Sequence, residues 1–511
     1  YDSSSCLVGL NGETRLLVDR DSVLEIVDTV RELLTELSYP FEMAVKAGAL
    51  SLMTAYNEVD GIPCTANPFL TNQLLRDQWG FSGFVVSDLY AIDGLMSQRV
   101  AAGRDEAGIL ALRSGVDSDL GGNCFSADLV RACREGRLAE ADIDRAVSRI
   151  LRLKFKMGLF DNPYVKVKKA EKLIGTSGHR EVAREVARQS VVLLKNENQL
   201  LPLSKEVKRV AVIGPNADNV YNQLGDYTAP QAPGSVITVL EGIRQKLPGA
   251  EVRYVKGCAV RDTLDTSIGE ACETAKNSDV VVVVLGGSSA RDFETDFLET
   301  GAAVANERKV SDMESGEGFD RIGLSLMGKQ VELLKALYAT GRPVVLVMVQ
   351  GRPLELNWAA EHIPAILTTW YPGGEGGRAI ADVLFGDYNP AGRLPLSYPR
   401  HVGQLPVYYN HKSAERHDYV EGTAAPLYPF GFGLSYTTFV YEGIDVRVEG
   451  DSVRVSVDVK NVGGRAGDEV VQLYLRDEQA SVVTPFMQLK AFQRVHLTSG
   501  ESRRVEFVLT E

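Results

Sequence analysis

One apolar run of this chain ends abruptly in a polar pair. The segment Gly83–Leu95, GFVVSDLYAIDGL, begins as an unbroken apolar stretch and stops at Ser87-Asp88. Uninterrupted Val and Phe are typical of a parallel strand that is buried on both faces. Carboxylates at the carboxyl ends of such strands build the active sites of α/β barrels. The alternative is that Asp88 caps the following helix, a common role for Asp. The segment therefore predicts an α/β fold and makes Asp88 a candidate site residue.

The composition limits the classes of ligand. At 511 residues the chain is too long for one core, and about two to four domains are expected. The net charge of -13 disfavours nucleic acid and anionic membranes as partners, so a neutral ligand is favoured. The sequence contains no stretch of 18 apolar residues, so we expect no membrane span. It gives no indication of an oligomeric state.

Metal and cofactor motifs are not found. The six cysteines and six histidines are dispersed, without CxxC, HxxE or HExxH spacing. We therefore expect no metal site, no disulfide framework and no cofactor. The chain begins with Tyr1 rather than Met and shows no signal peptide, so we infer that the natural amino terminus has been removed. Cellular location is then not predicted by the sequence itself.

The amino-terminal region alternates short apolar runs with helical patterns, which predicts βα units. A complete eight-fold barrel takes about 250 residues. Residues 1–165 are fewer, so we expect the carboxyl-terminal part of a β/α barrel whose beginning is missing. The expected strands are 49–56, 83–87 and 115–120, and the expected helices are 67–79, 106–114, 127–136 and 140–157.

Three further regions follow. Residues 166–204 are expected to be a linker and a helix (179–194), and residues 205–390 an α/β sandwich. Residues 391–511 are expected to be a linker and a small antiparallel β-sandwich, because their apolar and polar residues alternate. The strands expected in the α/β sandwich are 209–214, 251–255, 280–285 and 343–349, with helices at 237–247 and 326–339 and a third αβ element at 363–385. The strands expected in the β-sandwich are 454–460, 469–475 and 503–509.

A long polar stretch, Gly286–Gly323, interrupts the α/β sandwich. Loops longer than about 12 to 15 residues in a compact domain are usually functional or disordered. Within it, Glu317 is flanked by Gly316 and Gly318, which give the backbone wide conformational freedom. The alternative is a solvated surface Glu. The next pair, Asp320-Arg321, is expected to form an ion pair or to anchor a turn.

Asp88 and Glu317 together suit hydrolysis of a glycosidic bond. A retaining mechanism uses one ionised carboxylate as nucleophile and one protonated carboxyl as acid and later base, about 5 to 5.5 Å apart. A rigid strand end would keep Asp88 ionised. A loop that closes over the site would partly desolvate Glu317, which would raise its pKa.

Several longer motifs resemble glycoside hydrolase family 3, and they follow the family's order of barrel, α/β sandwich and fibronectin-III-like domain over nearly the whole chain. They are MTAYNEVDGIPCTANPFLTNQLLRDQWGFS before GFVVSD, VVLLKNENQLLPL, EGFDR, WYPGGEGGRAIADVLFGDYNPAGRLPLSYP, YPFGFGLSYTTF and VKNVGGRAGDEVVQLYLRD.

The resemblance implies that Asp88 is the nucleophile and Glu317 the acid/base, with Glu314 the less favoured acid. It also implies that Tyr56 contacts the nucleophile and the sugar, the alternative being a packed strand-end aromatic. The chain departs from the family pattern in three places. The Lys-His sugar-binding motif and an earlier Asp would lie upstream of residue 1, the stretch 17–30 is longer than expected, and Leu89-Tyr90 stands where Trp commonly follows the nucleophile.

The function implied is therefore a retaining, exo-acting β-glycosidase, with β-glucosidase as the leading activity, acting on oligosaccharides or on aryl or alkyl β-glycosides. A β-xylosidase with the same residues is one alternative. An inactive or carbohydrate-binding fragment is another, because the barrel start is missing. Family members that degrade polymeric sugars are often exported, so a periplasmic or secreted location is expected by analogy. The family subset that uses a barrel His as acid is disfavoured by the Glu317 motif.

Three other motifs are interpreted as structural. WYPGGEGG lacks the Lys and the spacing of a phosphate-binding loop, and VIGPNAD lacks GxGxxG. Asp117 and Asp119, near another predicted strand end, are expected to hydrogen-bond within the fold.

Overall fold

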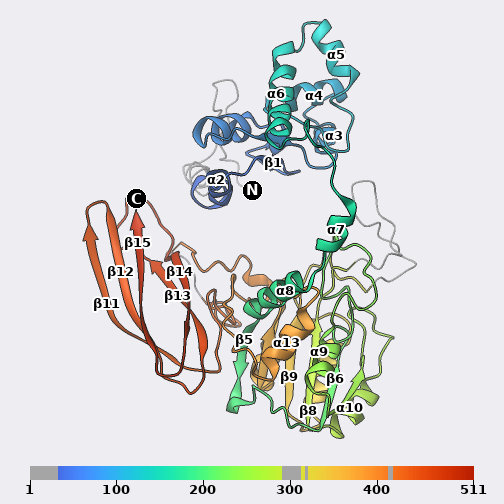
Figure 1. The fold of residues 1–511 in the computed structure, drawn as a ribbon, viewed down its shortest axis with the longest axis vertical. Coiled ribbons are helices and arrows are strands. Elements are labelled where there is room, and N and C mark those ends of the chain that lie inside the picture. Colours follow the sequence, from blue (N-terminus) through green and yellow to red (C-terminus); the bar gives the residue numbers. More distant parts are fainter. Residues whose placement is uncertain (1–32, 291–311, 317–319, 413–417, 511) are drawn as a thin grey trace. The chain divides into compact units, whose positions relative to one another are not determined.

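The computed structural model describes residues 33–290, 312–316, 320–412 and 418–510 (Figure 1). Contacts divide the chain into two compact units, Tyr1–Ala170 and Glu171–Glu511. Each unit is described by itself below.

The first unit is built around a parallel strand pair and surrounding helices. β1 (Ser51–Met53) pairs with β4 (Phe84–Val86) in parallel, with Leu52 opposite Val85. β2 (Glu58–Val59) and β3 (Ile62–Pro63) form a short hairpin. Within the described part of this unit, the sheets do not close into a barrel. The helical elements are η1 (Leu33–Leu37), α2 (Tyr39–Lys46), η2 (Cys64–Ala66), η3 (Phe69–Gln78), α3 (Ala91–Ser97), α4 (Arg104–Arg113), α5 (Ala127–Arg134) and α6 (Glu140–Lys156). The boundary between the two units falls within α7 (Val167–Leu173).

The strand expected at 115–120 is reduced to a single bridge. Val86 and Ser118 form one parallel bridge outside any named strand. The backbone N–H groups of Asp117 and Ser118 both donate to the Val85 carbonyl, at 2.7 and 3.2 Å. Two successive donors on one acceptor interrupt the regular ladder, so this segment lies beside β4 without forming a strand.

The second unit contains a six-stranded sheet in the order β5-β10-β9-β8-β6-β7, with β5 antiparallel to its neighbour. Alternate residues of β8 face opposite sides: Val281, Val283 and Leu285 belong to one buried core, and Val280, Val282 and Val284 to another. The sheet is therefore packed on both faces, as the expected α/β sandwich requires. Its strands are β5 (Val192–Asn196), β6 (Arg209–Ile213), β7 (Glu251–Val255), β8 (Val280–Gly286), β9 (Val344–Val349) and β10 (Ala365–Thr368). The helical elements of this region are α8 (Ser177–Ser190), η4 (Glu197–Gln199), α9 (Val239–Lys246), α10 (Ile268–Lys276), α11 (Gln330–Tyr338), α12 (Asn357–His362), α13 (Gly376–Leu384) and η5 (Val402–Gln404).

The helix expected at 179–194 ends earlier than predicted. α8 stops at Ser190, and Val191 has extended backbone (φ −65°, ψ 127°). The next residues form β5 and are buried in the sheet. The apolar run VVLL therefore continues as a strand rather than as a helix, because the open side of β10 offers it backbone partners and an apolar core.

Both outer strands of this sheet have distinctive surroundings. The Leu434 N–H donates to the carbonyl of Leu193 in β5, at 2.9 Å. On the opposite side, β7 exposes Glu251 and Arg253, which form an ion pair at 2.6 Å.

Asp382 of α13 connects three helices through ion pairs. Its side chain is fully buried and lies 2.7 Å from both Arg184 and Arg188 of α8, and it also pairs with Lys246 of α9. Burial alone would raise the pKa of Asp382, but the three cations hold that pKa below its usual range. This carboxylate fastens α8 to the sheet domain.

The carboxyl-terminal part of the second unit is a β-sandwich. One sheet contains β11 (Phe439–Glu449), β12 (Ser452–Asn461) and β15 (Ser502–Thr510), and the other contains β13 (Gly467–Leu475) and β14 (Gln488–Leu497). Val459 and Val505 of the first sheet share a buried core with Val471 and Val495 of the second. The alternating pattern predicted β12, β13 and β15, whereas β11 and β14 were not predicted.

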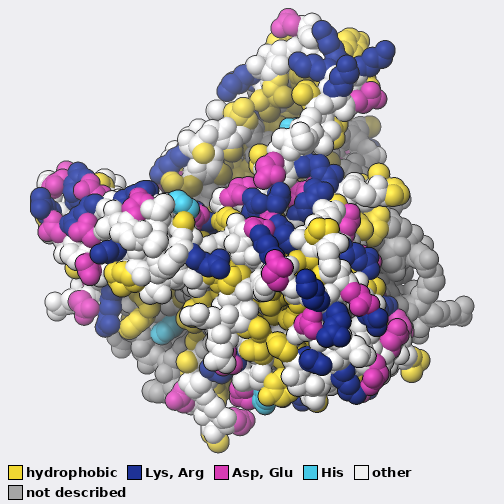
Figure 2. Space-filling view, turned by 60° about the horizontal axis from the view of Figure 1, so that its bottom comes forward, with side chains coloured by type: hydrophobic (Ala, Val, Ile, Leu, Met, Phe, Trp, Pro, Cys, Tyr) yellow, Lys and Arg dark blue, Asp and Glu magenta, His cyan; other side chains and the backbone are white. Residues whose placement is uncertain are grey.

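On the face shown in Figure 2, basic and acidic side chains are interspersed rather than gathered into a patch of one sign. Among the described residues, no helix combines the length and apolar character that would be needed to cross a membrane.

Candidate active site

The predicted residues Asp88 and Tyr56 lie at the same edge of the first unit's strand pair. Asp88 follows β4 and Tyr56 follows β1, and these parallel strands end side by side, since the Thr54 N–H donates to the Val86 carbonyl at 3.0 Å. The Tyr56 hydroxyl donates to the carbonyl of Leu89, the residue after Asp88, at 2.7 Å. Tyr56 is 46% exposed, so it is not the packed aromatic of the alternative interpretation. The fold thus places a phenol directly beside residues 87–90, the turn between β4 and α3 that contains Asp88 (the Asp88 turn).

Asp88 does not cap the helix that follows it. The residue before α3 is Tyr90, and no side chain caps this helix. The partly buried Asp88 carboxylate instead accepts the Leu89 N–H at 2.7 Å. Within the described residues, Lys and Arg form no ion pair with Asp88. Its carboxylate therefore has oxygen lone pairs that are not engaged by a cation.

Asp117, on the segment that lies beside β4, has a carboxylate that is buried and paired with cations, unlike that of Asp88. Asp117 is 5% exposed and lies 2.8 Å from both Arg76 and Arg149. It also accepts the backbone N–H of Val85 at 2.8 Å. Burial, and then the nearby Arg149, lower the pKa of Arg76 to about 10, which still leaves it charged at neutral pH. Asp117 is a structural residue, as the sequence indicated.

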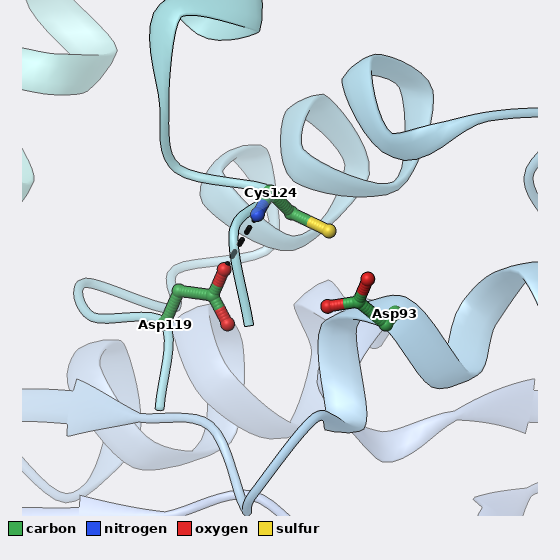
Figure 3. A group of neighbouring side chains, drawn as sticks. All are labelled: Asp93, Asp119 and Cys124. Atoms are coloured by element: carbon green, nitrogen blue, oxygen red, sulfur yellow. Dashed lines mark hydrogen bonds between the residues drawn. The ribbon is translucent and has the colours of Figure 1, made fainter. Parts of the chain in front are cut away.

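Asp93, Asp119 and Cys124 form a compact group near this edge (Figure 3). One potential ligand atom from each lies within 4.8 Å of the others. Asp119 accepts the Cys124 N–H at 2.7 Å, and Arg104 pairs with Asp93 at 3.1 Å. Burial and the two carboxylates raise the pKa of the Cys124 thiol to about 12, so it is protonated at neutral pH. Asp119 therefore hydrogen-bonds within the fold, as the sequence indicated.

Glu317, the predicted acid/base, lies outside the described residues, as do Gly318 and Phe319. Glu314, the less favoured acid, is 4% exposed and is paired with the buried guanidinium of Arg321. Burial raises the pKa of Glu314, and Arg321 opposes that shift. A Cβ added at Gly287 would collide with the Glu314 carboxyl, so this side chain lies against bare backbone. Glu314 is thus enclosed and ion-paired.

Asp320 and Arg321 have separate ionic partners. Asp320 accepts the Arg321 backbone N–H at 2.7 Å, which makes it a turn anchor, and pairs with Arg352 at 2.8 Å. The Arg321 guanidinium goes to Glu314 rather than to Asp320.

The WYPGGEGG motif is structural. Its Glu375 is 3% exposed and pairs with Arg180 at 2.5 Å and with Arg378 at 2.9 Å. A Cβ at Gly377 would collide with the Thr238 carbonyl, so the glycine allows α13 to approach the start of α9.

Two contacts of the Asp88 turn were missed at the sequence level. Ser87 is fully buried and accepts the Leu120 N–H at 2.9 Å, and Gln98 donates to the Tyr56 carbonyl at 2.7 Å. Both involve backbone atoms of residues more than 30 positions away, for which a single sequence gives no signal.

Comparisons with known proteins agree with these features. Models of the glycosyl hydrolase family 3 N-terminal and C-terminal domains match residues 17–153 and 191–436, and a fibronectin type III-like domain matches residues 469–511. A β-xylosidase of Formosa agariphila is 41% identical over 500 residues, and a periplasmic β-glucosidase of Salmonella typhimurium is 37% identical over 509. Each alignment covers 92% of this chain but 65% and 63% of the respective relative.

The structure of a β-glucosidase from Erythrobacter marinus is similar, with a TM-score of 0.83 at 41% identity. That alignment covers 92% of this chain and 64% of the other. The expected order of domains, the family's N-terminal domain followed by an α/β domain and a fibronectin-III-like domain, is confirmed by these matches. The chain belongs to glycosyl hydrolase family 3.

Proposed function

We propose that this protein is a retaining, exo-acting β-glycosidase that releases a non-reducing-end sugar, most readily β-glucose, from an oligosaccharide or an aryl or alkyl β-glycoside. Asp88 is the nucleophile, Glu317 the acid/base, and Tyr56 a substrate contact. In this proposal residues 1–165 carry the nucleophile and residues 205–390 the acid/base. Residues 166–204 and 391–511 contribute the connecting helix and the β-sandwich with its linker.

The reaction has two steps, the formation of a covalent glycosyl-enzyme intermediate and its hydrolysis. Asp88 attacks the anomeric carbon and forms a glycosyl ester, while the Glu317 carboxylic acid gives its proton to the departing glycosidic oxygen. Glu317, now a carboxylate, then takes a proton from water, whose oxygen attacks the anomeric carbon and releases Asp88. The sugar leaves with its β configuration retained because the anomeric carbon is inverted twice.

The observation that supports this proposal best is the state of Asp88. It stands at the end of a parallel strand, beside a tyrosine, and no described cation engages it. A nucleophile needs such available lone pairs, whereas the buried Asp117 on the neighbouring segment is engaged by Arg76, Arg149 and the Val85 N–H.

The identity of the sugar has two candidates. The relatives include proteins named β-glucosidase and a protein named β-xylosidase, so a β-xylosidase that uses the same residues is the second candidate. The two sugars differ by one hydroxymethyl group. Rates of hydrolysis of p-nitrophenyl β-glucoside and β-xyloside, measured side by side, decide between them.

The nucleophile is tested by covalent trapping. A 2-deoxy-2-fluoroglucosyl fluoride should add one sugar mass to the protein, and peptide mapping should place that mass on Asp88. Asp88→Ala should show neither labelling nor turnover. Labelling on another residue would reject the assignment of Asp88. A folded protein that binds sugars but is never labelled would instead support a carbohydrate-binding role.

The acid/base is tested through the leaving group. Glu317→Gln should slow the cleavage of glucosides with poorly acidic leaving groups far more than the cleavage of 2,4-dinitrophenyl glucoside, because only the former need a proton. Glu314→Gln serves as the matched comparison, and it should show no such dependence on the leaving group. Equal losses on both substrates for Glu317→Gln would contradict the acid role.

A further inference from the structure

We propose that Gln98 and Ser87 are positioning residues that hold the Asp88 turn from two sides, Gln98 acting through Tyr56. The inference rests on the proposed function in that Asp88 must be the nucleophile.

We call the contacts that hold the Asp88 turn from two sides the clamp. Its first side is the segment 118–121. The Ser87 N–H donates to the Ser118 carbonyl at 2.9 Å, and the Ser87 hydroxyl accepts the Leu120 N–H at 2.9 Å. Beyond Asp88, the Tyr90 N–H donates to the Leu120 carbonyl at 2.9 Å. The residues immediately before and two positions after Asp88 are therefore tied to the same short segment.

Gly121 completes this side. Its φ of +75° is in the left-handed region, and a Cβ there would collide with the Leu89 side chain. A glycine thus lets the segment lie directly against the Asp88 turn.

The second side is a closed ring of contacts. Tyr56 donates its hydroxyl to the Leu89 carbonyl, and Gln98 donates its amide to the Tyr56 carbonyl at 2.7 Å. Gln98 directly follows α3, the helix that begins just after the Asp88 turn. The backbone therefore connects Asp88 to Gln98 through α3, and two hydrogen bonds, from Gln98 to Tyr56 and from Tyr56 to Leu89, close the ring.

The turn needs such support because it contains an unfavourable backbone conformation. Tyr90 has φ +57°, which is uncommon for a non-glycine residue and persists where surrounding contacts enforce it. The Asp88 carboxylate accepts the Leu89 N–H, so its direction follows the backbone of Leu89. A looser Leu89 would misdirect the carboxylate without removing it.

The test of the Gln98 side is a double-mutant cycle in the full chain. Gln98→Glu keeps the shape of the side chain but loses the donor, and Tyr56→Phe loses the hydroxyl. We expect Gln98→Glu to lower the rate constant of covalent labelling by the fluoroglucosyl fluoride about three- to tenfold, with the inhibitor's dissociation constant unchanged. Because Gln98 acts through Tyr56, the double variant should be no slower than Tyr56→Phe alone.

Two further variants give the controls. Gln98→Lys retains a donor and should recover most of the rate. Ser97→Ala removes an exposed hydroxyl that donates to the Gly94 carbonyl within α3, and this variant should match the parent. Ser87→Ala tests the other side and should slow labelling similarly. Thermal unfolding of each variant separates a loss of positioning from a loss of folding.

Each outcome has a distinct meaning. If Asp88 is labelled in the parent but Gln98→Glu labels at the parent rate, or if its effect multiplies with that of Tyr56→Phe, the clamp is wrong and the proposed function stands. If the parent is labelled at a different residue, the proposed function fails first.

Discussion

Two acidic side chains on adjacent segments of the first unit show how a fold distinguishes a structural carboxylate from a reactive one. Asp117 is buried, bridges Arg76 and Arg149 and accepts a backbone N–H from Val85. Asp88, two positions beyond the same strand, accepts one N–H from its own neighbour and is partly exposed. Both are Asp near the end of β4. The difference in their partners, rather than in their position, indicates which one is available for chemistry.

Replacing Asp88 by Asn tests the reactive half of this comparison and should have the largest effect. We expect turnover to fall by roughly 10⁴-fold, because the amide is a poor nucleophile. Stability against urea should be unchanged, since no described cation depends on this carboxylate. A marked loss of stability would show that Asp88 also supports the fold, and the comparison would break.

Asp117→Asn tests the structural half. It leaves Arg76 and Arg149 without their buried partner, so we expect the first unit to lose about 3 to 5 kcal/mol of unfolding free energy. Urea denaturation followed by fluorescence measures this loss. Variant protein that remains folded should still be labelled at Asp88. Intact stability with lost labelling would reverse the roles assigned to the two residues.

Asp382 extends the comparison to pH. Because its folded pKa is lowered, its contribution is fully present above the unfolded value of about 3.9 and is lost as the pH falls through the lower folded pKa. Asp382→Asn should therefore cost about 3 kcal/mol at pH 7, and the gap from the parent should narrow below about pH 4. Denaturation curves at pH 7, 4 and 3 check this. A gap that stays constant with pH would exclude the ionic explanation.

The smallest expected effect comes from a helix cap in the first unit. The Ser126 hydroxyl accepts the Asp128 N–H at the start of α5. Ser126→Ala should cost about 1 kcal/mol and leave the rate of Asp88 labelling unchanged. A drop in that rate would show that general destabilisation alone mimics a positioning effect, so this variant calibrates the others.

The sequence predicted helices and strands best where apolar residues followed a single periodicity, either that of a helix or that of a strand. The run VVVVVL of β8 and the apolar stripe of α6 were located to within a residue or two. It failed at Val191–Leu194, where the same letters fit a helix or a strand and only the contact with β10 decides. It also did not predict α10 or α12.

At the candidate site, the sequence placed Asp88 after a buried strand because apolar periodicity marks where that strand stops. It could not find Ser87 or Gln98 as partners of the turn, since their hydrogen bonds go to the backbone of distant residues. Nearly every residue offers the same backbone hydrogen-bonding groups, so a hydrogen bond to the backbone leaves no recognisable motif in the sequence. The sequence assigned Asp117 a role within the fold, but it did not predict that Arg76 and Arg149 would be its partners.

The outer strands of the six-stranded sheet bear on how the protein avoids aggregation. An unprotected outermost strand is a template for adding a strand from another molecule. Here the segment around Leu434 occupies part of the outward-facing backbone of β5, and the charged pair Glu251–Arg253 stands on β7. A strand from another molecule would have to displace the Leu434 segment at one edge or desolvate the Glu251–Arg253 ion pair at the other. The apolar six-stranded sheet is therefore protected from pairing edge to edge with the sheet of another copy.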